Sequence, residues 1–340
     1  MNKFHKAAML LASVALVLGL VACPNKAEPK PKPEPTPEPY TILDAGTDGT
    51  AGTEATYVTF GEWPQSVLPE GTTVTVDETV SKTVGLFTYY AGSDGNWYVK
   101  QEEKANSTGN AYKYSDGTAV KQKSENSTRY FKVEPIKWRV LEEAEGKKFL
   151  LAEVGLMSLQ YYDKSNERTI DGNTIYANNY MHSKIRAWLN GYKYQLDDAD
   201  NADYETKGFL QTAFTSEAQA KIATTTVDNS VESTLYSSNP YVCDNTCDKV
   251  FLLSGKEATS EGYGFNTENI RIRKPTDFAL ATGAYNHGGS YGGLWWFRSP
   301  NPHPYENDMV NGMSYDGLGD PECYVNYNEH SVVPALLVSQ

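Results

Sequence analysis

The chain has 340 residues, with 30 Lys and Arg against 43 Asp and Glu, and a formal net charge of −13 at pH 7. This acidic balance argues against nucleic acid and anionic lipid headgroups as ligands, because both would be repelled by the surface of the protein. No nucleic-acid partner is therefore expected.

The N-terminus predicts export and lipid attachment. Lys3 and Lys6 precede an apolar run over 9–22, which is short for a membrane-spanning helix of ~20 residues and typical of a secretory signal peptide. The signal peptide over 1–22 ends in Leu-Val-Ala, and Cys23 directly after it resembles the lipidated cysteine of a bacterial lipobox. The resemblance implies cleavage before Cys23 and anchoring in a lipid bilayer through acyl chains. We therefore expect a lipid-anchored protein at the outer membrane or cell surface.

Residues 23–54 predict a flexible linker. Seven prolines alternate mainly with Lys and Glu over 24–39, and the polar stretch 40–54 follows. Such a sequence cannot bury enough apolar surface to fold and favours extended polyproline-II structure. A single folded domain is expected over 55–340.

The pattern of the folded part predicts an α+β domain with short antiparallel strands, a few helices and long loops. Strands are expected at 57–61, before a polar turn at 61–66, and then at 84–90, 96–100, 129–143, 147–153 and 249–254. The second and third of these strands, and likewise the fourth and fifth, form hairpin-like pairs. Helices are expected at 178–192, closed by Gly191, at 215–222 and at 275–282. His182 falls in the first helix, where a packing or capping role is favoured over a ligand role.

Residues 285–331 have the composition of a recognition surface. Of these 47 residues, 29 are Asn, Tyr, His, Asp, Ser or Gly, and six are Tyr. Tyr provides a stiff contact surface and Ser, Gly and Asn provide adaptable hydrogen bonding, as in antibody paratopes. The alternative is an ordinary loop-rich surface, where Asn, Asp, Ser and Gly also gather. The apolar runs 294–297 and 332–338 predict strands that hold these residues on a rigid frame.

The remaining cysteines and acidic residues give no clear site. Cys243 and Cys247 could close a small loop by a disulfide or remain free thiols. The acidic residues of 197–205 do not fit a calcium-binding loop, because Ala202 stands where an oxygen ligand is needed, so a solvated loop is favoured. Neither a metal nor a cofactor is expected.

Eight short sequence motifs, found in a fixed order, carry a resemblance that covers the chain from about residue 56 to its end. They are FGEWPQ (60–65), EPIKWRVL (134–141), FLLAE (149–153), SKIRAWLN (183–190), AFTSEAQAKI (213–222), DKVFLLS (248–254), WWFRSP (295–300) and VVPALLV (332–338). Together with the lipoprotein leader, they resemble the extracellular bacterial family of the Treponema variable protein, a target of a diversity-generating retroelement. The resemblance implies a C-type lectin-like fold of the formylglycine-generating-enzyme type and a C-terminal variable region.

The composition of 285–331 agrees with that implication. Mutation of adenines in AAC or AAT codons gives Asn, Tyr, His, Asp, Ser, Gly and Cys among its products, but never Lys, Glu or Trp. The positions that match this output, and that we expect to bind ligand, are Asn286, His287, Ser290, Tyr291, Asn301, His303, Tyr305, Asn307, Asn311, Ser314, Tyr315, Asp316, Asn326, Tyr327, Asn328 and His330. Cys323, expected on a polar loop, fits the same output.

The sequence departs from two neighbouring families. The calcium-binding words of sugar-binding C-type lectins are absent, so calcium-dependent sugar binding is not implied. Formylglycine-generating enzymes use two active cysteines near the C-terminus, whereas Cys323 has no second cysteine close by in the sequence. We expect a surface-displayed binding module that engages an unknown protein or cell-surface ligand, and no enzyme activity. The alternative is a cell-envelope enzyme on the same fold, with His287 or His303 as base and Cys323 as nucleophile.

Overall fold

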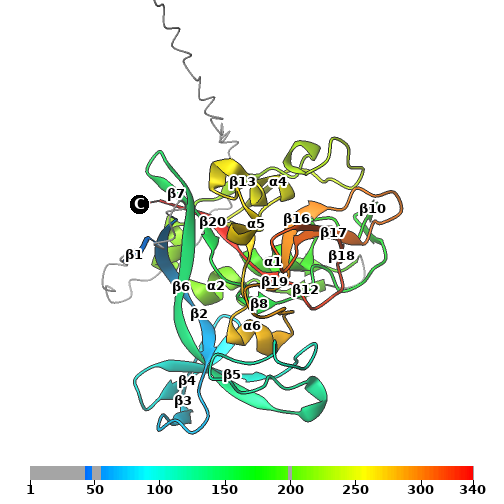
Figure 1. Ribbon diagram of the computed structural model, residues 1–340. Coiled ribbons are helices and arrows are strands. Elements are labelled where there is room, and N and C mark those ends of the chain that lie inside the picture. Colours follow the sequence, from blue (N-terminus) through cyan, green and yellow to red (C-terminus); the bar gives the residue numbers. More distant parts are fainter. Residues whose placement is uncertain (1–42, 48–54, 198–200, 340) are drawn as a thin grey trace, which may run out of the picture.

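The computed structural model describes residues 43–47, 55–197 and 201–339 (Figure 1). The expected signal peptide, Cys23 and most of the expected linker lie outside these described residues. Within them, no helix is long and apolar enough to cross a membrane.

The larger sheet has nine strands, in the order β15-β20-β7-β6-β5-β4-β3, with β2 joined to β6 and β1 joined to β2. Its strands are β1 (Leu43–Thr47), β2 (Thr56–Val67), β3 (Val76–Val84), β4 (Phe87–Gly92), β5 (Trp97–Glu102), β6 (Thr128–Ala144), β7 (Lys147–Ala152), β15 (Val250–Phe251) and β20 (Ala335–Ser339). The long strand β6 organises the sheet, because β5 pairs with its first residues and β7 with its last, while β2 pairs along its middle. The expected pairs β4–β5 and β6–β7 are therefore confirmed.

Two expectations for the start of the domain are wrong. Residues 43–47, expected in the flexible linker, form β1 and pair antiparallel with β2. The polar turn expected at 61–66 is a continuation of β2, because Trp63 is fully buried and its indole N–H donates to the Leu156 carbonyl at 3.0 Å. Irregularities in the pairing of β2 with β6 interrupt the simple alternation that a regular strand shows.

The smaller sheet has five strands in the order β18-β17-β16-β19-β8. They are β8 (Met157–Ser158), β16 (Trp295–Pro300), β17 (Met309–Met313), β18 (Gly319–Tyr324) and β19 (Ser331–Val332). Three further antiparallel pairs are β9 (Arg168–Ile170) with β10 (Asn173–Ile175), β11 (Lys193–Gln195) with β12 (Asn201–Asp203), and β13 (Thr225–Val227) with β14 (Thr246–Asp248). All strand pairs of the smaller sheet are antiparallel except β16 with β19.

The helices are short. They are α1 (Lys184–Asn190), α2 (Phe209–Ala213), α3 (Ser216–Lys221), α4 (Gly255–Ala258), α5 (Glu268–Arg271) and α6 (Asp277–Thr282), with 3-10 turns η1 (Lys123–Glu125), η2 (Val231–Ser233) and η3 (Glu261–Tyr263). Gly191 ends α1 in a left-handed conformation, as expected, and the Thr215 and Thr276 hydroxyls cap α3 and α6 by accepting backbone N–H groups.

The helix expected over 178–192 is shorter than its apolar spacing suggested. It begins only after Ser183, whose hydroxyl accepts the Arg186 N–H at 3.2 Å. His182 therefore lies in the turn before α1, where burial and the nearby Arg168 lower its pKa.

One hydrophobic core joins the sheets and helices, from Val58 in β2 to Val338 in β20. Trp63 contributes to it from β2, and its ring lies 5.1 Å from Phe87 and 5.9 Å from Trp188 between ring centroids. The observed architecture is thus a mixed α+β fold with mainly antiparallel sheets.

Candidate functional site

Strands β16 and β17 form a buried frame within the expected variable region. Every residue of both strands is buried. The indole N–H of Trp296 donates to the Leu159 carbonyl at 2.8 Å and that of Trp295 to the Arg271 carbonyl at 3.3 Å. Because both indoles are buried and hydrogen-bonded, each is fixed in one orientation.

Three aromatic side chains gather on this frame, and we refer to His287, Tyr291 and Tyr315 as the His287 cluster. The His287 and Tyr315 rings are stacked, with centroids 4.3 Å apart and planes 15° apart. Tyr291 meets both edge-on, at 4.7 Å from His287 and 5.6 Å from Tyr315. His287 and Tyr291 are exposed and Tyr315 is half-buried, so the cluster presents aromatic surface to solvent.

The backbone beneath the His287 cluster is held by hydrogen bonds between segments. Gly292 N–H donates to the Tyr315 carbonyl at 2.9 Å, and His287 N–H donates to the Gly292 carbonyl at 3.0 Å. A Cβ at Gly292 would lie 2.4 Å from the Arg273 carbonyl oxygen, so only glycine allows this close approach. The loop after α6 is therefore tied to the β17–β18 turn.

Tyr285 extends the cluster inward. Its ring centroid lies 6.1 Å from that of Tyr315 and 6.5 Å from that of Tyr112. Burial, together with the nearby Tyr315 and Glu329, raises the pKa of Tyr285.

A second group of exposed residues lies toward the other end of the β17–β18 pair, where Met309 is opposite Tyr324. Tyr305 is 96% exposed although its φ is 75°, a left-handed conformation that side chains disfavour, and its backbone N–H donates to the Tyr241 hydroxyl at 3.0 Å. Tyr327 is also exposed, and its ring centroid lies 5.1 Å from that of Tyr324. His303 is exposed and its Nδ1 lies 3.4 Å from Glu306 Oε1.

The structure divides the sixteen expected binding residues by exposure. The exposed residues are His287, Ser290, Tyr291, His303, Tyr305, Tyr327 and Asn328, and the half-buried ones are Asn286, Asn307, Ser314, Tyr315, Asp316 and Asn326.

Three of the sixteen residues are in the interior, so their expected place on the binding surface is wrong. Asn301, Asn311 and His330 are each at most 3% exposed. Asn301 Oδ1 accepts the His303 N–H at 2.8 Å and so shapes the loop. Asn311 lies within the buried strand β17. His330 stacks on Trp296 at 4.0 Å between ring centroids.

Cys323 was expected on a polar loop, but it is buried within β18. Its Sγ lies 3.1 Å from His330 Nε2, within reach of a hydrogen bond. Burial lowers the pKa of His330 to about 3, so this imidazole is neutral at physiological pH. Exposures of 1% for Cys323 and 3% for His330 leave no route for a substrate, and the pair does not have the access that a nucleophile and its base require.

The other cysteines and the acidic loop do not form a site among the residues described. Cys243 is a free thiol, so no disulfide closes the loop to Cys247, and burial raises the thiol pKa. Asp198 and Asp200 of the acidic loop lie outside the described residues, and no group of three His, Cys, Asp or Glu side chains with metal-binding geometry occurs within them.

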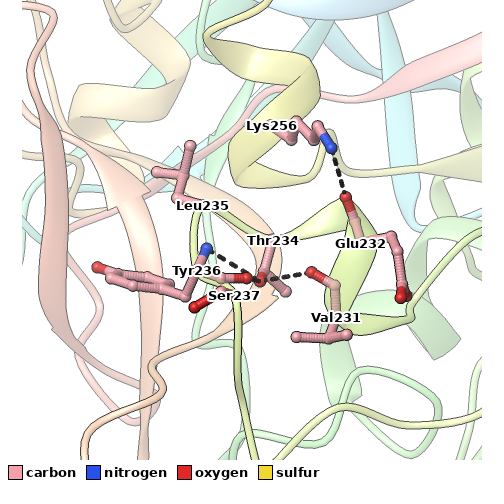
Figure 2. Close-up of a pocket in the computed structure, with 7 residues that line it drawn as sticks. All are labelled: Val231, Glu232, Thr234, Leu235, Tyr236, Ser237 and Lys256. Atoms are coloured by element: carbon pink, nitrogen blue, oxygen red, sulfur yellow. Dashed lines mark hydrogen bonds between the residues drawn. The ribbon is translucent and has the colours of Figure 1, made fainter.

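Two hollows border the expected variable region. One, of about 490 Å³, lies along the 231–237 loop beside α4, where Lys256 Nζ donates to the Glu232 carbonyl at 3.0 Å (Figure 2). Its exposed Leu235 reaches to 3.9 Å from the Cβ position of Gly319, next to the exposed Leu318. The other, of about 550 Å³, is lined by Asn328 together with Lys104 and residues of β4 and β5.

Several neighbours of residues 285–331 were not foreseen from the sequence. Asn286 Nδ2 donates to the Ala111 carbonyl at 2.8 Å, and Tyr241 supports Tyr305. The segment YSSNPY over 236–241 has the same Tyr, Ser and Asn composition as 285–331, so composition alone would have indicated the Tyr241 loop. Nothing in the sequence indicates Ala111, whose contribution is a backbone carbonyl.

Comparison with protein families identifies one family for this chain. Residues 145–340 match a family described as a domain of unknown function, DUF6273, and the chain belongs to that family. No curated protein matches the chain. No solved structure matches it either.

Proposed function

We propose that the protein is a lipid-anchored binding module of the bacterial cell surface, with a C-type lectin-like fold of the formylglycine-generating-enzyme type. Its ligand-binding face consists of the exposed and half-buried positions of 285–331. The ligand is a protein or another cell-surface molecule. The anchor is Cys23 in a lipid bilayer.

The observation that carries the proposal is the exposed His287 cluster on a frame whose strands β16 and β17 are wholly buried. Rigid aromatic side chains lose little conformational entropy on binding and dominate the energetics of many interfaces. A buried frame beneath them allows the exposed positions to vary without loss of the core. The mixed α+β architecture with mainly antiparallel strands is compatible with the lectin-like fold.

The proposed diversification has a direct genetic test. A non-coding near-copy of the DNA for 285–338 is expected near the gene, with Asn codons where this chain has Tyr, His or Asp. The control is internal, because the codons for Trp295, Trp296 and Phe297 must be identical in both copies. Absence of such a copy from the complete source genome would contradict diversification by a retroelement.

Binding capacity is tested separately by display of two libraries. The first library randomises His287, Ser290, Tyr291 and Tyr315. The matched control randomises four exposed residues of β3: Thr79, Val80, Ser81 and Thr83. Both libraries are selected against purified lysozyme as an unrelated test protein. We expect folded binders from the first library at a much higher frequency than from the second. Equal yields would mean that 285–331 has no special capacity for recognition.

A further inference from the structure

A small aromatic hollow lies outside residues 285–331, and none of the sixteen expected binding residues lines it. Phe149 of β7 forms its centre. The Phe149 ring stacks on Phe251 of β15 with centroids 5.9 Å apart, and Tyr263 of η3 meets it edge-on at 5.3 Å. Val227 and Leu337 complete the apolar lining.

Three acidic side chains surround this aromatic floor: Glu142, Asp228 and Glu257. Glu257 is neutralised by the buried Arg298, whose Nη2 donates to Glu257 Oε1 at 3.0 Å and also to the Asp228 carbonyl at 2.9 Å. None of the described residues that line the hollow is Lys, Arg or His. Arg298 therefore balances one of the three negative charges, and the charges of Glu142 and Asp228 make the rim of the hollow negative.

The negative field reaches the aromatic floor. Burial raises the pKa of the Tyr263 hydroxyl, the charges of Glu257 and Glu142 raise it further, and the charge of Arg298 lowers it by less than either. The same field stabilises a cation placed over the ring, where the π system also attracts positive charge.

The hollow is small. Its volume of about 90 Å³ is below the ~150 Å³ of an engineered protein cavity that binds benzene. This volume suits the end of one extended chain. An apolar wall with an acidic rim is complementary to an alkyl chain that ends in a positive charge.

We propose that this hollow binds a primary alkylammonium group, the chemistry of a lysine side chain, presented by a partner protein. The methylene groups contact Phe149 and Tyr263, and the ammonium group lies toward Glu142 and Asp228. The remainder of the partner stays outside, since only a single side chain fits. This site is separate from the proposed variable face, so it offers a constant contact whatever that face recognises.

The first experiment uses n-pentylammonium as the probe and 1-pentanol as its neutral counterpart, each titrated into the folded domain and followed by NMR. We expect saturable shifts with pentylammonium and at least ~3-fold weaker binding of pentanol, because only the cation gains from the carboxylates. Binding of the cation must also weaken as NaCl is raised. Equal binding of both probes would overturn the proposal.

Matched variants locate the site. Glu142→Gln removes a lining charge, whereas the control Glu143→Gln removes the neighbouring carboxylate, which is exposed and paired with Lys148 at 2.7 Å. We expect Glu142→Gln to weaken pentylammonium binding by at least ~3-fold while Glu143→Gln changes it little. Thermal melts of both variants verify folding. Equal effects of the two substitutions would show that the probe senses only the overall charge of the protein.

A third measurement addresses the source of the ammonium group. The peptide acetyl-Gly-Lys-Gly-amide is compared with acetyl-Gly-norleucine-Gly-amide, in which an uncharged side chain replaces lysine. Binding of the lysine peptide at least as tight as that of pentylammonium supports a protein partner. Binding of free pentylammonium with exclusion of the lysine peptide would contradict a protein partner and indicate a free amine.

Discussion

The imidazole of His287 lies flat against the phenol ring of Tyr315, which joins the loop after α6 to the turn between β17 and β18. Tyr291 contacts both rings, so the three side chains support one another at the surface. The arrangement is therefore partly preorganised before any ligand binds.

We predict that His287 and Tyr315 are energetically coupled. A double-mutant cycle with His287→Ala and Tyr315→Ala should give a coupling energy of ~0.5–1.5 kcal/mol, as for other aromatic pairs. The measurement is the free energy of unfolding in urea for the wild type, both single variants and the double variant. Strictly additive effects would show that the stacked pair is not populated in solution.

The buried frame of β16 and β17 and the proposed ligand-binding face should differ in how well they tolerate truncation of a side chain. Trp295→Ala is expected to cost ~3–5 kcal/mol, because it leaves a large cavity in the core. Tyr305→Ala should change the free energy of unfolding by no more than ~0.5 kcal/mol, since the side chain is almost fully exposed. Thermal and urea unfolding measure both, and the reverse order of effects would remove the division into frame and face.

The buried asparagine of β17 should not accept a charge. Asn311→Asp would place a carboxylate in the interior, where Asn311 Oδ1 already finds no hydrogen-bond partner among the described residues. We expect the free energy of unfolding at neutral pH to fall by ~3 kcal/mol or more. Asn307→Asp, at a half-buried position, is the matched control and should have a small effect. Similar losses for both variants would contradict the interior position of Asn311.

Stability should depend on pH through His330. The folded protein keeps this imidazole neutral down to a pKa of about 3, whereas the unfolded chain binds a proton near pH 6.5. The free energy of unfolding is therefore not reduced by His330 above pH 6.5. As the pH falls from 6.5 toward 3, protonation of His330 in the unfolded chain lowers it by ~1.4 kcal/mol for each pH unit.

The free energies of unfolding at about pH 7 and about pH 5 test this contribution. The wild type should lose ~2 kcal/mol more than His330→Gln over this interval. The comparison uses the change with pH and not the absolute stability, so a general destabilisation by the substitution does not affect it. Equal pH dependence of the two proteins would mean that His330 can be protonated in the folded state.

Anchoring has a biochemical test. Labelled palmitate should enter the wild-type protein in its bacterial host, and Cys23→Ser should abolish the label, because acylation requires the Cys23 sulfur. The control is Cys243→Ser, which removes a free thiol of the folded domain. Equal labelling of the Cys23→Ser variant and the wild type would exclude a lipid anchor at Cys23.

The strand pairs of the larger sheet were predictable where apolar residues cluster between clear turns, as in β6 and β7. Strand β3 was not, because seven of its nine residues are exposed, six are polar, and apolar residues do not alternate with polar ones along it. The continuation of β2 through 61–66 was also missed, since Gly61, Pro64 and Ser66 are typical of turns, although Gly61, Trp63 and Pro64 are buried in the strand.

The candidate site was only partly accessible to sequence reasoning. Composition indicated a recognition surface over 285–331, and most of the selected residues do retain exposure. It could not distinguish Asn311 from Asn307, because burial is decided by the pairing of β17 with its neighbours and not by residue type. His330 and Cys323 meet only through the same strand pairing.

The hairpin-like contact of β1 with β2 has a mechanical consequence for a protein held by its N-terminus. If Cys23 is anchored as we propose, β1 is the first strand of the described chain after the anchor, and among the described residues it pairs with β2. Detachment of β1 would release its five residues, ~17 Å of chain at ~3.3–3.6 Å per residue. In the proposed lipid-anchored protein, β1 would therefore detach before the core strands bear load.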